Sequence, residues 1–126
     1  MNHKRILIID DDYRIREVTK LTLELMAKWE VLTASSGSAG LALAQTEQLD
    51  AILLDIMMPE LDGMATLKQL KANHATQYIP VFLLTAKAQV LDQQSSGNFK
   101  VAATISKPFD PLTLSSTIAE VLSWSN

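Results

Sequence analysis

Short apolar runs and longer stretches of helical period alternate along the chain. The apolar runs occupy residues 5–9, 31–34, 51–54, 80–84 and 102–105. Runs such as RILII and AILL are typical of strands buried on both faces of a parallel sheet. Between and after the runs we predict helices over residues 13–29, 39–45, 64–72, 86–96 and 111–122. Five successive strand–helix units predict one α/β domain over residues 1–126, with helices on both faces of the sheet and right-handed crossovers.

The first predicted helix places apolar residues at intervals of three and four. We expect this stripe to face the core, because such spacing gathers residues on one side of a helix. Its members are Ile15, Val18, Leu21, Leu25 and Trp29. In the last predicted helix, Leu114, Ile118, Val121 and Leu122 form a similar apolar set.

Polar and small residues mark where the helices start. Asp12 is the predicted N-cap of the first helix, and Ser35 and Ser36 are candidates for the second. Asp110, followed by proline, is the predicted N-cap of the last helix. Asp62 and Gly63 predict a turn in which the glycine takes the left-handed conformation.

The composition narrows the class of protein. The 126 residues carry a net charge of −3 and no cysteine, which excludes disulfides and thiolate metal sites. No apolar run is long enough to cross a bilayer, and lysine and arginine are scattered rather than clustered. We therefore expect a cytoplasmic protein that binds neither a membrane nor, directly, a nucleic acid.

Polar residues directly follow the predicted strands. They are Asp10 and Asp11 after the first strand, Asp55 after the third, Thr85 after the fourth and Lys107 after the fifth. Ligands of open parallel sheets bind beyond the carboxyl ends of the strands, so these side chains should converge there. Three carboxylates repel one another unless a cation lies among them, and an all-oxygen ligand set favours Mg²⁺ or Mn²⁺. A cation, a carboxylate nucleophile, a hydroxyl and an ammonium group together suit phosphoryl transfer.

Four motifs, in order and each at a predicted strand end, carry a resemblance to a known family. They are ILIIDDD, DAILLDIMMPELDG, TAKA and SKPF. With them the chain resembles the receiver domain of two-component response regulators, and in particular the stand-alone, chemotaxis-type regulators. The resemblance covers essentially the whole chain and implies a flavodoxin-like (βα)5 fold. Its doubly wound, parallel five-stranded sheet would have the strand order 2-1-3-4-5.

The resemblance also implies a role for each matching residue in binding the metal. Asp11, Asp55 and the backbone carbonyl of Met57 would bind Mg²⁺ or Mn²⁺ directly. Asp10 would act mainly through a metal-bound water.

Further residues would bind the phosphoryl group. Asp55 would be its acceptor, and Thr85 and the backbone N–H of Ala86 would each bond one phosphoryl oxygen. Lys107 would pair with a third oxygen, and the Lys107–Pro108 peptide is a candidate cis bond.

The function implied is that of a signalling switch rather than an enzyme with an external substrate. A histidine kinase or histidine phosphotransfer protein would supply the phosphoryl group, which the domain would slowly hydrolyse. The signal would pass to an unknown downstream protein through the face made by strand 4, helix 4, strand 5 and helix 5. The resemblance also allows a homodimer that forms on phosphorylation.

Three features depart from the usual receiver pattern. Thr104 occupies a position at which many receivers carry Tyr or Phe, which puts the aromatic half of the usual switch in doubt. The segment 93–101 lacks the usual Gly-Ala pair, and we expect Phe99 and Val101 there to contact partners. Met57 and Lys87 flank the path of the hydrolytic water, and we expect them to orient it poorly and so prolong the life of the phosphorylated form.

Three other functions remain open. A phosphatase of the haloacid dehalogenase type would need a general-acid Asp where this chain has Met57. A flavin-binding electron carrier would need a hydroxyl-rich phosphate loop where this chain has three aspartates. A receiver-like module that works by binding alone, without phosphorylation, stays open because of Thr104, although the presence of the acceptor, the metal ligands, Thr85 and Lys107 argues against it.

Overall fold

The computed structural model describes residues 4–57, 63–85 and 101–124. Along the chain its elements are β1 (Arg5–Ile9), α1 (Tyr13–Ala27), β2 (Glu30–Ala34), α2 (Gly37–Thr46), β3 (Ala51–Asp55), α3 (Gly63–Ala72), β4 (Val81–Thr85), β5 (Ala103–Ser106) and α5 (Pro111–Leu122). Each of these strands begins and ends within one residue of its predicted bounds. The helix predicted over residues 86–96 lies outside the described residues.

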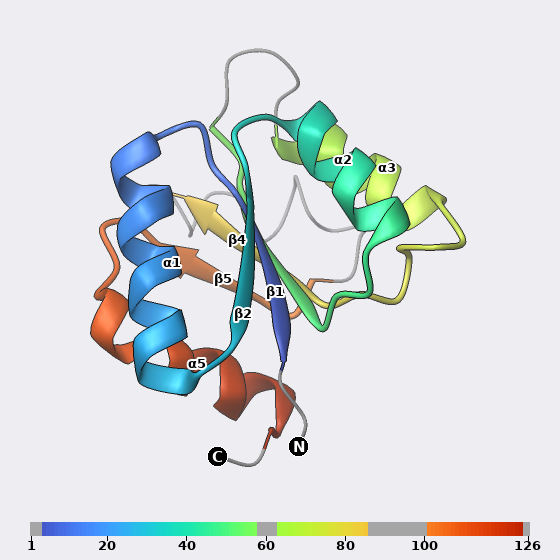
Figure 1. Ribbon diagram of the computed structural model, residues 1–126. Helices are drawn as coiled ribbons and strands as arrows, with labels where there is room; N and C mark the ends of the chain where they lie inside the picture. The colour runs from blue at the N-terminus through green and yellow to red at the C-terminus, as the bar shows by residue number, and fades with distance from the viewer. Residues whose placement is uncertain (1–3, 58–62, 86–100, 125–126) are drawn as a thin grey trace.

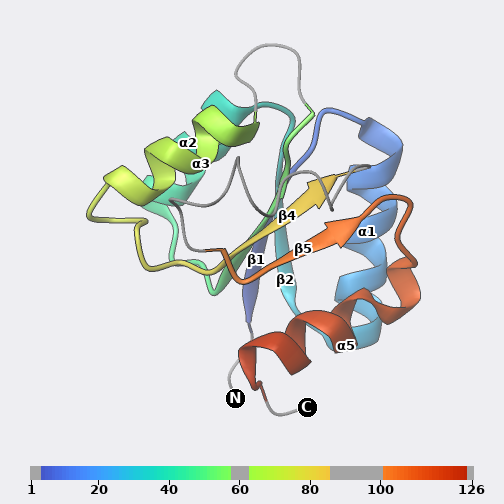
Figure 2. The ribbon, with the colours of Figure 1, turned by 180° about the vertical axis from the view of Figure 1, so that it is seen from behind.

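The strands form one parallel sheet in the order β2-β1-β3-β4-β5 (Figure 1), which confirms the predicted topology. Helices α1 and α5 cover one face and α2 and α3 the other, as the view from behind also shows (Figure 2). This is the doubly wound, flavodoxin-like arrangement. It brings the carboxyl ends of β1 and β3 side by side, because their register pairs Ile9 with Leu54.

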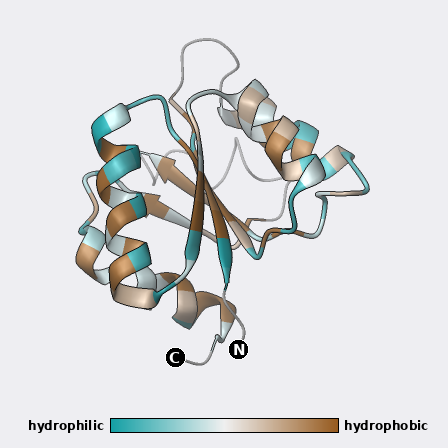
Figure 3. Ribbon diagram, viewed as in Figure 1, coloured by the Kyte–Doolittle hydropathy of each residue, from teal (hydrophilic) through white to brown (hydrophobic). Residues whose placement is uncertain are grey.

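Each face of the sheet has its own hydrophobic core, since successive side chains of a strand point to opposite faces. Leu7 and Ile9 of β1 belong to the core under α2 and α3, whereas Ile6 and Ile8 belong to the core under α1 and α5. In Figure 3 the strands are coloured brown through the middle of the sheet, with hydrophilic starts on β1 and β2, whereas the helices are mixed. The described helices include none that is long and apolar enough to span a membrane.

Three helices begin at the residues that the sequence predicts as caps. The Asp12 side chain accepts from the backbone N–H groups of Arg14 and Ile15, and Ser36 and Asp110 cap α2 and α5 in the same way. These bonds satisfy N–H groups that the first helical turn leaves without a partner. The cap of α1 directly follows the acidic residues at the end of β1.

The prediction for the buried face of α1 is wrong in part. Trp29 is buried in the core, although it lies just beyond the end of the helix, and Ile15 is half-buried. Val18, Leu21 and Leu25 are 52%, 57% and 68% exposed, and the buried residues of the helix are Thr19 and Leu23. The helix carries apolar residues on two sides, and its packing against α5 determines which side is covered. Val121 of α5 is likewise exposed, whereas Leu114 and Ile118 are buried as predicted.

The prediction for Gly63 is wrong too. Among the described residues no glycine has a positive φ, and Gly63 is the first residue of α3. Glycine is required there for space, since an added Cβ would lie 2.1 Å from the Cα of Ile56 and 2.7 Å from the carbonyl oxygen of Asp55. The start of α3 therefore packs directly against the backbone that carries Asp55.

Candidate active site at the carboxyl edge of the sheet

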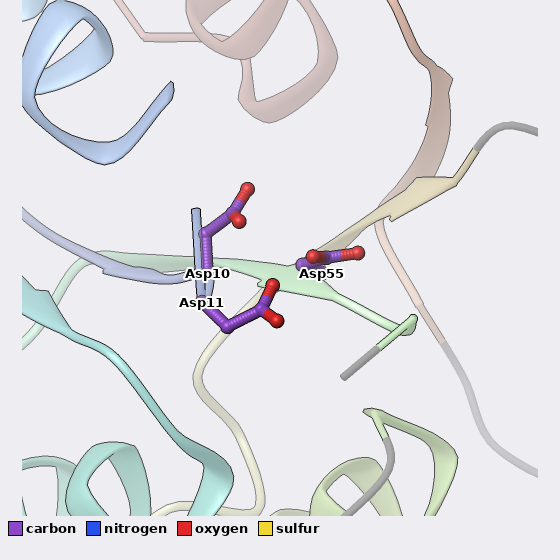
Figure 4. A group of neighbouring side chains, drawn as sticks. All are labelled: Asp10, Asp11 and Asp55. Carbon is purple, nitrogen blue, oxygen red and sulfur yellow. The ribbon is translucent and has the colours of Figure 1, made fainter. Parts of the chain in front are cut away.

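The polar residues that follow the strands meet at one edge, as predicted. Asp10 and Asp11 follow β1 and Asp55 ends β3, and Figure 4 shows their side chains together. One carboxylate oxygen from each of the three lies within 4.8 Å of the others. Asp10 and Asp55 are buried, whereas Asp11 is exposed. Among the three carboxylates of the cluster, that of Asp11 is therefore the one exposed to solvent.

Lys107 reaches into this cluster from the end of β5. Its Nζ lies 3.1 Å from Oδ2 of Asp10 and 3.3 Å from Oδ2 of Asp55. Burial opposes the charge on Lys107, but its bonds to Asp10 and Asp55 outweigh that effect and raise the pKa of the ammonium group. Lys107 is therefore held as a cation between two buried carboxylates.

Asp55 has a perturbed acidity. The pKa of its carboxyl group is raised from 3.8 to about 6, and burial is the largest cause. The N–H of Met57, which lies 3.0 Å from Oδ1, lowers this pKa. The charge of Asp10 raises it, and Lys107 lowers it. Desolvation disfavours the charged carboxylate more than the nearby donors favour it. The group still ionises within the physiological range, which a nucleophilic carboxylate requires.

Asp10 is held at every polar atom. Its backbone N–H donates to the carbonyl of Ala34 at 3.1 Å, and its Oδ1 accepts from the N–H of Asp12 at 2.9 Å. Its Oδ2 accepts from Lys107, and its backbone carbonyl accepts from Nη1 of Arg16 at 2.8 Å. The sequence analysis did not find Arg16, because no pattern in the sequence links a helical arginine to a carbonyl six residues earlier.

The structure describes some, but not all, of the other residues that the sequence predicts for this site. Thr85 ends β4 and is buried, and Met57 follows β3 with an exposed side chain. The peptide bond between Lys107 and Pro108 is cis, which confirms that prediction. Ala86, Lys87 and Phe99 lie outside the described residues.

On β5 and just before it, Thr104 is half-buried beside Leu83, and Val101 is half-buried and packs against the core under α2 and α3. The role of Val101 in binding partners stays a prediction.

The donor set fits a small divalent cation. All three side chains offer carboxylate oxygens, and two opposite ligands of Mg²⁺ are about 4 Å apart at ideal bond lengths. A separation within 4.8 Å therefore needs only small adjustments. Since two of the carboxylates are buried, a cation would also relieve their mutual repulsion.

A groove lies directly beside the cluster, between α1 and the segment that joins β5 to α5. Its volume is about 650 Å³, and we call it the α1–α5 groove. Its floor is largely apolar, and Lys107 connects it to the acidic cluster. The lining residues include Ile15, Val18, Thr19, Pro108, Phe109 and Pro111.

Comparison with known proteins gives consistent matches. The family model described as the response regulator receiver domain matches residues 6–119. Protein PilH of Pseudomonas aeruginosa is 40% identical over 119 residues, which are 94% of this chain and 97% of that protein. The DNA-binding dual master transcriptional regulator RpaA of Synechocystis sp. is 41% identical over 106 residues, or 84% of this chain and 44% of that protein.

Solved structures match over nearly the same length. The chemotaxis protein CheY4 of Vibrio cholerae superposes with a TM-score of 0.87 at 30% identity, covering 95% of this chain and 99% of that one. The chain spans about half the length of the curated transcriptional regulators that it matches, from 44% to 49%.

Proposed function

The chain belongs to the response regulator receiver family, whose members are signalling modules rather than classical enzymes, and on that premise we propose that it is a phospho-acceptor switch. In this proposal residues 1–126 form one receiver domain. Asp55 accepts a phosphoryl group, with Mg²⁺ or Mn²⁺ held by Asp11, Asp55 and the carbonyl of Met57, and Asp10 acts through water.

The observation that carries the proposal is the ion pair between the buried, ionisable carboxylate of Asp55 and the ammonium group of Lys107. Because the pKa of Asp55 is about 6, its carboxylate outnumbers the protonated form by about ten to one at pH 7. One of its oxygens would form a bond to phosphorus while the bond from phosphorus to the donor histidine nitrogen breaks. The electron pair of that bond returns to the imidazole, which leaves neutral because its other ring nitrogen carries a proton.

The charges that develop in this transfer need nearby donors. The divalent cation would neutralise charge on the phosphoryl oxygens. Lys107 stands 3.3 Å from Oδ2 of Asp55 and would donate to another phosphoryl oxygen without crossing the site. Thr85 and the N–H of Ala86 complete the proposed set of donors.

We place the phosphodonor protein on the α1–α5 groove and the exposed side of α1. A donor that delivers a phosphoryl group to Asp55 must cover the surface next to Lys107, and this surface is largely apolar, with Asp12 and Arg14 also lining it. The stripe of Val18, Leu21 and Leu25 continues the groove along α1 and suits the apolar face of a helix. Leu21→Glu should slow transfer from a phosphohistidine protein and leave transfer from a small donor unchanged. Equal rates from the protein donor would contradict this placement.

The output of the switch is proposed to pass through β4, β5 and α5 together with the helix between the two strands. Hydrogen exchange before and after phosphorylation tests this. Altered protection is expected at β4, β5 and α5, and a change confined to α2 and α3 would contradict the proposal.

The deciding experiment is the intact mass after incubation with Mg²⁺ and a small acyl or amidophosphate donor. The wild type should gain the mass of one phosphoryl group. The gain should be absent in the Asp55→Asn variant, and absent in the wild type when no metal is added. Asp50→Asn is the matched control, because it removes a carboxylate at the opposite edge of the sheet, where Asp50 accepts from the N–H of Arg5.

This experiment, together with an assay for phosphate release, separates the alternative functions. No mass gain in a protein that binds Mg²⁺ would favour the module that works by binding alone. Steady release of phosphate from a generic ester would favour a phosphatase.

A further inference from the structure

Arg16 is a polar residue of α1 to which the proposed chemistry gives no role. Its guanidinium lies partly buried, 5.5 Å from the centre of the Tyr13 ring, and donates from Nη1 to the backbone carbonyl of Asp10 at 2.8 Å. The ion pairs of the described residues do not include Arg16. Its bond is therefore directed at the backbone of the acidic cluster and not at a carboxylate.

The carbonyl of Asp10 belongs to the peptide plane that joins Asp10 to Asp11. A donor on that oxygen restricts rotation of the plane, and so sets the direction in which Asp11 leaves β1. Asp10 is already held through its N–H and both carboxylate oxygens, so Asp11 is the residue whose orientation depends on this plane. Asp11 is also the exposed member of the cluster.

We propose that Arg16 is a positioning residue for the metal site: it fixes the Asp10–Asp11 peptide so that Asp11 is already directed toward a divalent cation. The inference rests on the proposed function, since it requires a cation between Asp11 and Asp55. Arg16 contacts neither the cation nor the phosphoryl group. Groups that orient metal ligands in this way typically change metal affinity by about tenfold or more when removed.

The direction in which the affinity for Mg²⁺ changes when Arg16 is replaced distinguishes a positioning role from a purely electrostatic one. Loss of a positive charge near an acidic site strengthens cation binding, because a repulsion is removed. Loss of a positioning bond weakens it. Arg16→Met retains a long side chain without donors and should raise the dissociation constant for Mg²⁺ about tenfold. Arg16→Lys retains one donor and should recover part of the affinity.

The test is a Mg²⁺ titration of the full chain, followed by backbone amide NMR shifts at pH 8. Lys20→Met is the matched control, since it removes the same charge from α1 one turn further along, and its affinity should equal or exceed that of the wild type. Urea unfolding without metal shows how much each substitution destabilises the fold.

Each outcome has a distinct meaning. Weaker binding in Arg16→Met, with partial recovery in Arg16→Lys, supports the inference. Unchanged or tighter binding in Arg16→Met overturns it, even if the variant is less stable, because Arg16 would then be purely structural. If Arg16→Met does not fold, an Arg16→Lys affinity for Mg²⁺ weaker than that of the wild type supports the inference, and one equal to or tighter than that of the wild type overturns it. A wild type that binds no Mg²⁺ refutes both the proposed function and this inference.

Discussion

Asp55→Asn should stabilise the metal-free protein while it abolishes phosphorylation. The carboxyl group of Asp55 is buried next to Asp10, and its pKa is raised from 3.8 to about 6. A group that binds its proton more tightly in the folded state makes the fold most stable at low pH. That stability is lost as the pH rises from about 4 through about 6. Asparagine keeps the shape of the side chain and never ionises.

The size of the effect follows from the two pKa values. A shift of about two units corresponds to about 3 kcal/mol once the pH is well above both values. This is an upper estimate, because Asn also gives up the contact of Lys107 with Oδ2. At pH 8 the variant should gain up to about 3 kcal/mol, and at pH 5 about half of that.

Urea unfolding in the presence of a chelator measures the gain directly. Trp29 and Trp124, in edge-to-face contact at 5.3 Å, provide a fluorescence signal for global unfolding. Asp110→Asn is the control, because asparagine caps α5 as well as aspartate does. The control should show no gain that grows with pH.

Adding Mg²⁺ provides a second arm of the test. A cation that binds only the folded state stabilises it by mass action, so the wild type should recover the difference at high Mg²⁺. A gain that is the same at pH 5 and pH 8 would refute the reasoning, since it would show that ionisation of Asp55 is not its source. So would an equal response of wild type and Asp55→Asn to Mg²⁺.

Three further predictions concern single residues. Gly63→Ala places a Cβ 2.1 Å from the Cα of Ile56 and should lower the unfolding free energy in urea by about 3 kcal/mol. Ala72→Gly, at the last residue of the same helix, should cost at most about 1 kcal/mol, and similar losses in the two variants would contradict the steric argument. Thr19→Val removes a buried hydroxyl that has no hydrogen-bond partner in the described structure and should raise the unfolding free energy by about 1 kcal/mol, with any loss counting against it. Met57→Asn should speed loss of the phosphoryl group several-fold in a mass time course, and an unchanged lifetime would exclude Met57 as its cause.

The alternation of apolar runs and helical stretches was sufficient to predict the strands and the parallel sheet. The reason is local, because a run such as RILII is stable only with both faces covered, and helices are the elements that cover them. The caps at Asp12, Ser36 and Asp110 are equally local, since each bonds N–H groups within three residues. The strand order was inferred from the resemblance, as periodicity alone does not determine which strands are neighbours.

Convergence of Asp10, Asp55 and Lys107 was also predictable, because the carboxyl ends of parallel strands share one edge. The bond from Lys107 to Asp10 spans 97 residues of sequence, and its geometry depends on the register of the sheet. The raised pKa of Asp55 likewise depends on burial that only the assembled layers create.

The buried side of α1 and the role of Arg16 were decided by tertiary structure alone. Apolar residues on two sides of α1 satisfy the same helical period, and packing against α5 buries Thr19 and Leu23 while Val18 and Leu21 stay exposed. Arg16 has no sequence signal, since its partner is a backbone carbonyl and every residue has one. The sequence by itself therefore determined the elements and the edge at which the chemistry lies. The tertiary structure determined which surfaces stay open and how the acidic residues are held, because these depend on contacts between segments that no local pattern encodes.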